Sequence, residues 1–411
     1  MSERTVSPGA TRGATHAPES MTETLEPRRL LSGGLSPRDD DGDSSGTNHD
    51  HGGDEIHQDG HRHRHDRGDT FVRADLVSDG ATPAAHTDPH LKNPWGIAFN
   101  PDGFWWVSDN HSSVSTLYDA AGNPSPPPPG TPLVVNIPTP DNPAGGGAPT
   151  GIVFSGGDGF VVTKDGKSGP SRFLFATEDG TIAGWAPNVD FTHAVIGADS
   201  TDTDASYKGL ALATTPAGDR LFAADFHNHR IDVFDSSFMP VHLAPGAFSD
   251  RRVPADFAPF NVQNLGGKLF VTYAKVDASG EDEEAGPGLG MIDVYSASGR
   301  LLDRFARGGA LNAPWGLAQA PDHFGRFGGD VLVGNFGDGH ILAFDRHGHF
   351  DGYLRDADRK PIEIDGLWGI GFGNGKQAGP TDTLFFAAGT NDEADGLFGS
   401  LTAQARGKDE M

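Results

Sequence analysis

Carboxylate and amide side chains follow the apolar segments of this 411-residue sequence at recurring places. Oxygen donors of this kind are the ligands that Ca²⁺ and Mg²⁺ prefer. We therefore expect a site for Ca²⁺ or another divalent cation, with the candidate ligands Asn93, Asp109, Asp225, His227, Asn261 and Asn312. The alternative is that Asp and Asn are turn residues that bond nearby backbone amides, which their recurrence in every repeat favours.

Two histidines suggest a second kind of metal site. His227 and His229 are two residues apart, which would place both side chains on one face of a strand, and Asp225 precedes them by two more. A His/His/carboxylate corner of this spacing suits a transition metal. The alternative is that both imidazoles end a strand at a hydrated rim.

Several function classes are excluded or disfavoured. The sequence has no cysteine, which excludes disulfides, thiolate metal sites and cysteine nucleophiles. It contains no G-x-x-x-x-G-K-[ST] phosphate loop, no EF-hand series and no G-x-S-x-G elbow. Its net charge of −26 disfavours nucleic acid and anionic membrane surfaces as partners. No apolar segment is long enough to predict a membrane-spanning helix.

The elements that must position these side chains recur from Phe71 onward with a period of about 50 to 58 residues, which is typical of propeller blades. Each repeat opens with an apolar strand that is usually centred on glycine, and the six openings begin at Pro94, Pro149, Tyr207, Pro259, Pro314 and Leu367. Further apolar segments and a polar one follow, bounded by turn residues. The pattern predicts an all-β fold over residues 70–402: a single six-bladed β-propeller with four-stranded blades.

Three packing features are also expected. The glycine of each opening has no Cβ, so that the innermost strands can approach closely. The tryptophan before it, as in Pro94-Trp95-Gly96, is expected to pack between blades. Residues 71–77 alternate like a strand, and we expect them to form the outer strand of the sixth blade and to close the ring.

Residues 1–69 and 403–411 are expected to be disordered, because they are polar and have too few apolar side chains to form a core. The N-terminal tail contains a histidine-rich run, which could bind a soft transition metal or be simply solvated. Within the tail, Leu25–Gly33 resembles the LEPR-XLL segment near the N-termini of large bacterial surface proteins. This resemblance implies an extracellular or cell-surface protein, although the first thirty residues lack the apolar core of a secretory signal.

The Pro-Trp-Gly openings and the run Ala224–Asp235 resemble NHL-type six-bladed propellers, and more particularly an uncharacterised bacterial family with this repeat. The resemblance covers residues 70–400 and implies one ring with loops gathered on one face. It names no reaction.

Strands within a blade alternate in direction, which places the loops between second and third strands on the same face as the loops that enter each opening. This loop face includes Lys208 and an acidic insert, Asp277–Gly288. A rigid mouth built from six loops suits recognition, and we expect a monomeric binding or interaction propeller that takes a protein or small-molecule ligand here.

The alternative is a metal-dependent hydrolase of the lactonase type. In six-bladed relatives of that type, one carboxylate and several amides hold a channel ion that polarises a carbonyl. By resemblance, Asn93, Asn261 and Asn312 would supply the amides, and Asp109 or Asp225 the carboxylate.

Overall fold

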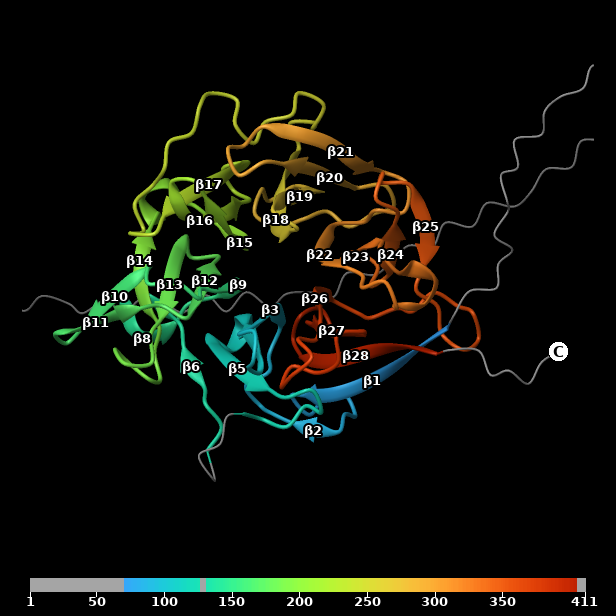
Figure 1. Ribbon diagram of the computed structural model, residues 1–411, viewed down its shortest axis with the longest axis horizontal. Helices are drawn as coiled ribbons and strands as arrows, with labels where there is room; N and C mark the ends of the chain where they lie inside the picture. Colours follow the sequence, from blue (N-terminus) through green and yellow to red (C-terminus); the bar gives the residue numbers. More distant parts are fainter. Residues whose placement is uncertain (1–69, 126–130, 405–411) are drawn as a thin grey trace, which may run out of the picture. The chain divides into compact units, whose positions relative to one another are not determined.

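Each predicted opening forms the innermost strand of a blade. The computed structural model describes residues 70–125 and 131–404, and six blades of antiparallel strands are arranged around a central axis (Figure 1). The predicted tail with its LEPR-XLL-like segment and histidine-rich run lies outside the described residues, as do residues 405–411. The all-β six-bladed fold is confirmed. The last strand ends at Gln404, two residues beyond the expected boundary.

The first three blades follow one another along the chain. Blade 1 contains β3 (Pro94–Phe99), β4 (Trp105–Asp109), β5 (Val114–Tyr118) and β6 (Val135–Asn136). Blade 2 contains β9 (Pro149–Phe154), β12 (Phe173–Thr177), β13 (Thr181–Trp185) and β14 (Val195–Asp199), with the hairpin β10 (Val161–Lys164) and β11 (Lys167–Pro170) inserted. Blade 3 contains β15 (Tyr207–Thr215), β16 (Gly218–Asp225) and β17 (Arg230–Asp235).

The remaining blades complete the ring. Blade 4 contains β18 (Phe257–Leu265), β19 (Lys268–Lys275), β20 (Gly290–Tyr295) and β21 (Leu301–Arg307). Blade 5 contains β22 (Pro314–Gln319), β23 (Val331–Asn335), β24 (Ile341–Phe344) and β25 (Phe350–Tyr353). Blade 6 contains β26 (Leu367–Phe372), β27 (Thr383–Ala388), β28 (Leu397–Gln404) and β1 (Thr70–Ser78).

The structure also contains short elements in addition to the main strands of the blades. They are β2 (His86–Thr87), β7 (Pro138–Thr139), β8 (Asn142–Gly146) and the 3₁₀ helices η1 (Asn110–Ser112), η2 (Thr201–Thr203) and η3 (Gly325–Phe327). No helix in the part of the chain that the structure describes is long and apolar enough to cross a membrane.

The predicted close approach of innermost strands is confirmed. A Cβ on Gly96 would lie 2.5 Å from the carbonyl oxygen of Thr150 in the next blade, and one on Gly316 would lie 2.5 Å from that of Trp368. In blade 4 this position is Asn261, whose Nδ2 donates to the carbonyl oxygen of Trp315 at 2.8 Å. The side chain of Asn261 therefore joins two blades in place of the usual backbone contact.

The tryptophans pack between blades, as predicted, and they do so at the axis. Trp95, Trp315 and Trp368 meet there with Phe226 and Phe260, and these five residues come from blades 1, 5, 6, 3 and 4. The indoles of Trp95 and Trp368 stack with centroids 3.6 Å apart, and Trp315 contacts both edge-on. A register shift beside each tryptophan explains the outcome, because a β-bulge turns its side chain in a new direction. We call these five residues the aromatic plug.

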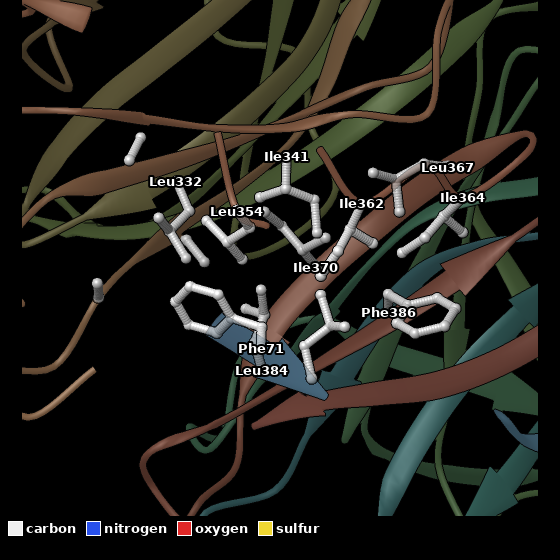
Figure 2. Close-up of a cluster of buried hydrophobic side chains, with 14 of the residues drawn as sticks. Phe71, Leu332, Ile341, Leu354, Ile362, Ile364, Leu367, Ile370, Leu384 and Phe386 are labelled. Carbon is white, nitrogen blue, oxygen red and sulfur yellow. The ribbon is translucent and has the colours of Figure 1, made fainter. Parts of the chain in front are cut away.

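The two ends of the described chain close the ring as predicted. β1 pairs antiparallel with β28 from Thr70↔Gln404 to Ser78↔Leu397. Phe71 of β1 is buried in the apolar core between blades 5 and 6, together with Leu384 and Ile370 (Figure 2). Its ring contacts that of Phe324 at a centroid distance of 4.9 Å. The closing strand is therefore held by side-chain burial as well as by its ladder.

We expect Phe71→Ala to lower the free energy of unfolding by about 3 kcal/mol, because it leaves a cavity in this core. Val72→Ala, at the neighbouring position of the same strand, should change it by less than about 0.5 kcal/mol, since Val72 is 41% exposed and Phe71 only 2%. Chemical denaturation of both variants makes the comparison. Equal effects would show that burial of Phe71 does not hold the closure.

Candidate functional site at the loop face

The predicted carboxylate ligands lie apart, each bonded within its own surroundings. Asp109 is fully buried, and burial raises its pKa well above the ordinary value. Its Oδ2 accepts a hydrogen bond from Thr116 Oγ1 at 2.8 Å, whereas its buried Oδ1 has no hydrogen-bond partner among the described residues. Asp225 accepts hydrogen bonds from the backbone nitrogens of Ser206 and Asn228, each at 3.2 Å. Both side chains therefore stabilise the ends of second strands.

The predicted amide ligands also have partners. Asn93 Oδ1 accepts from Trp368 Nε1 at 3.1 Å, and Asn312 Oδ1 accepts from the backbone nitrogen of Gly286 at 2.6 Å. Asn261 joins blades 4 and 5, as described above. Across residues 70–125 and 131–404, no group of three or more His, Cys, Asp or Glu side chains is arranged to hold a metal ion. The binding of a divalent cation by these residues stays a prediction.

His227 and His229 lie in the turn between β16 and β17 rather than on a strand, and both are exposed. His229 has a left-handed φ of 55°. The strand spacing that suggested a shared face therefore does not apply. His227 instead lines a cleft beside the mouth.

A buried lysine marks the centre of the loop face. The side chain of Lys208 is 2% exposed, and its Nζ lies 2.7 Å from Asp282 Oδ1 and 3.3 Å from Glu178 Oε1. The same Nζ lies over the rings of Trp95 at 5.6 Å and Phe226 at 5.3 Å. Carboxylates and aromatic faces together offset the cost of burying an ammonium group.

The charge of Lys208 is fixed by these neighbours. Burial lowers the pKa of Lys208, but the charges of Glu178, Glu283 and Asp282 outweigh burial and raise it above its ordinary value. The residue therefore remains an ammonium group at neutral pH. It is a poor candidate for an amine nucleophile, which needs a lowered pKa.

The acidic insert supplies two of the carboxyl groups, Asp282 and Glu283. Lys275 Nζ, at the end of β19, donates to Glu284 Oε2 at 2.5 Å, and the backbone nitrogen of Gly286 is held by Asn312. Burial raises the pKa of Glu283 to about 8 against the attraction of Lys208. The insert thus forms an acidic wall over the mouth.

A second wall comes from the loop after β27. Asn391, Asp392 and Glu393 have successive left-handed φ angles of 59°, 50° and 63°, a run that L residues rarely adopt. Asp365 holds this loop by accepting a hydrogen bond from the backbone nitrogen of Asn391 at 2.8 Å. Burial, together with the charge of Glu178, raises the pKa of Glu393 to about 7.

Two polar atoms of this site have no hydrogen-bond partner. They are Glu393 Oε1, an acceptor, and Trp95 Nε1, a donor, and both atoms are buried. Buried polar groups in proteins are almost always paired with protein, water or ligand atoms. We call the group Lys208, Glu178, Asp282, Glu283 and Glu393, with Trp95 beneath, the Lys208 site.

A polar cleft of about 650 Å³ adjoins the Lys208 site. Glu178 and Asp282 belong to both, and Asp204 and His227 also line the cleft. The cleft therefore brings further carboxylates next to the Lys208 site.

Sequence reasoning named Lys208 and the acidic insert as parts of the loop face but did not select Glu283 or Glu393. One signal was available. The residue before the glycine is Trp95, Trp315 or Trp368 in three openings but Lys208 in the third blade. A charge at a position that carries an aromatic residue of the plug in four of the other blades implies buried partners.

Relatives of similar length exist in a giant virus. Uncharacterized protein R648 of Acanthamoeba polyphaga mimivirus is 33% identical over 332 residues, which are 79% of this chain and 78% of the relative. Uncharacterized protein L690 of the same virus is 34% identical over 334 residues, 79% of this chain and 84% of the relative. The chain belongs to the family of these mimivirus proteins. The expected restriction to bacteria was therefore too narrow. No protein-family model matches the sequence.

Solved structures give weaker likenesses. Virginiamycin B lyase from Staphylococcus aureus has a TM-score of 0.46 and 15% identity, with 81% of this chain and 99% of the lyase covered. The gluconolactonase XC5397 from Xanthomonas campestris has a TM-score of 0.31 and 16% identity, with 56% and 82% covered. Likenesses this distant carry no information on the activity of the family described here.

Lys208→Met keeps most of the volume and removes the charge, and we expect it to lower the free energy of unfolding by about 2 kcal/mol near pH 8. The loss should be smaller near pH 5, where the surrounding carboxyl groups with raised pKa are protonated. Lys275→Met, which breaks the more exposed pair with Glu284, serves as the control and should cost less than about 1 kcal/mol. Denaturation curves at both pH values measure these changes in the free energy of unfolding. Equal losses for the two variants would contradict a special role of Lys208.

Proposed function

We propose that this protein is a binding propeller whose loop face takes a cationic ligand at the Lys208 site. The observation that supports this best is the charge balance: one ammonium group interacts with four carboxyl groups, those of Glu178, Asp282, Glu283 and Glu393. A cationic ligand would offset part of the surplus negative charge. An ammonium group on the ligand would also give the unpaired Glu393 Oε1 a donor.

The pKa values set the pH dependence of such binding. Both Glu283 and Glu393 have a pKa raised above the ordinary 4.5, to about 8 and about 7. The two protonated carboxyl groups therefore contribute fully to the free energy of unfolding below pH 4.5. This contribution is lost as the pH rises through 7 and 8. A bound cation favours the ionised carboxylates, so that its affinity should rise over the same interval and binding should release protons.

We expect putrescine to bind, and its neutral analogue 1,4-butanediol not to bind, because the diol lacks the charge. Isothermal titration calorimetry at pH 6 and pH 8.5 measures the affinity, and buffers of different ionisation enthalpy give the number of protons released. Affinity should be higher at pH 8.5. Absence of putrescine binding at both pH values, or equal binding of the diol, would contradict the proposal.

A pair of variants locates the site. Glu393→Gln removes one carboxylate and should weaken putrescine binding about tenfold, as expected when one charged contact is lost. Asp392→Asn, the exposed neighbour in the same loop, should leave the affinity unchanged. A similar loss in both variants would indicate a long-range effect of net charge rather than a contact.

The lactonase-type hydrolase remains the alternative, and it requires a bound metal ion. In this case adding one metal among Ca²⁺, Mg²⁺, Mn²⁺ and Zn²⁺ to EDTA-treated protein should raise the melting temperature by several degrees, because an ion that binds only the folded state stabilises it. Asn93→Ala should abolish that rise. Flat melting curves with all four metals would exclude this alternative and leave putrescine binding unaffected.

A further inference from the structure

Blade 3 lacks the outermost strand that the other five blades have. Their outer positions are taken by β6, β14, β21, β25 and β1 (Figure 1). Beside β17 the chain makes one bridge, Phe234↔Pro240, and two backbone hydrogen bonds, from Asp235 N to Met239 O at 2.9 Å and from Val241 N to Val233 O at 2.7 Å. It then departs toward blade 4, where the backbone nitrogen of Phe248 donates to the carbonyl oxygen of Gly299 at 2.8 Å.

This departure leaves part of the edge of β17 open. In an antiparallel ladder the backbone groups of every second residue point to the same side. Since the carbonyl oxygen of Val233 points outward to Val241, the N–H and C=O of Ile231 also point outward. Within the described chain they have no partner on that side, because residues 242–248 have already diverged.

A cavity of about 620 Å³ lies between the two diverging segments. Ile231 and Val233 of β17 line one side, and Leu243 and Phe248 of the departing chain line the other. An exposed strand edge beside an apolar-lined slot is the arrangement that binds extended peptides by adding a strand.

The surroundings of the slot are acidic. Arg230 is already paired with Asp232 at 2.7 Å and Asp225 at 3.2 Å. Asp199 and Asp202, on the blade 2 side of the cavity, are exposed and form no ion pair with another described residue. The cavity therefore has a surplus of negative charge at one rim.

We propose that the slot beside β17 binds an extended basic peptide, which supplies the missing fourth strand of blade 3. The peptide backbone bonds to the N–H and C=O of Ile231. Its apolar side chains face Leu243 and Phe248, and its basic side chains face Asp199 and Asp202. The occupant is thus a segment of alternating basic and apolar residues in a partner protein.

The probe is a fluorescein-labelled Lys-Val-Lys-Val-Lys peptide, and its fluorescence anisotropy with the full chain measures binding. We expect saturable binding that Asp202→Lys weakens about tenfold. The control Asp303→Lys makes the same charge change on exposed β21 of blade 4 and should have little effect. Glu393→Gln should also have little effect, which separates this slot from the Lys208 site.

A peptide N-methylated at both valines keeps the charges but loses two backbone donors, and it should bind at least tenfold more weakly. Equal affinity of the two peptides would overturn the proposal, since only charge would then be recognised. No binding of the unmodified peptide would also overturn it. A dimer that Asp202→Lys dissociates, found by analytical ultracentrifugation without peptide binding, would assign the edge to a second copy of this chain instead.

Discussion

The backbones of innermost strands approach one another so closely around the axis that a Cβ is excluded at most of the contact points. At Gly151 and Gly369 an added Cβ would lie 2.4 Å and 2.6 Å from a backbone atom of the neighbouring blade. Because each strand contacts the next in this way, the six sheets form a narrow ring with the apolar cores lying between blades. Asn261 is the exception in blade 4. Its side-chain amide joins the two blades by a hydrogen bond, in place of the close backbone contact.

The narrow ring also determines what lies at the axis. A bulge beside Trp95, Trp315 and Trp368 turns these residues, each of which precedes a contact point, toward the axis. They meet there with Phe260, at the same position of blade 4, and with Phe226 in the aromatic plug. Lys208 occupies this position in blade 3. Its ammonium group is buried against Trp95 and Phe226 and therefore requires carboxylates, which loops of blades 2 and 4 supply through Glu178 and Asp282. One substitution in the repeat thus creates a charged site on an apolar base.

Departures from the regular blade mark the two regions to which we assign functions. The long β19–β20 insert and the left-handed loop at Asn391–Glu393 form the walls of the Lys208 site. The early departure of the chain after Val241 opens the edge of β17. Regular blades pair their backbone groups within the sheet, whereas irregular segments leave polar groups or cavities that a ligand can fill.

The sequence by itself determined the architecture, because each repeat is specified by residues that are close together in the chain. Glycine-centred openings, apolar strand segments and the alternation of residues 71–77 were sufficient to predict six blades, the close approach at glycine and the closure by β1, which pairs with β28. Only the tertiary structure decided the site. Lys208, Glu178, Asp282 and Glu393 come from four different blades, and their pKa values depend on burial and on neighbours distant in the chain. Asn93 and Asn312 looked like metal ligands in sequence, yet nearby atoms in the fold already hydrogen-bond to their amide oxygens. Local spacing specifies strands and turns, whereas the electrostatics of a site depends on distances that are set only when the ring closes.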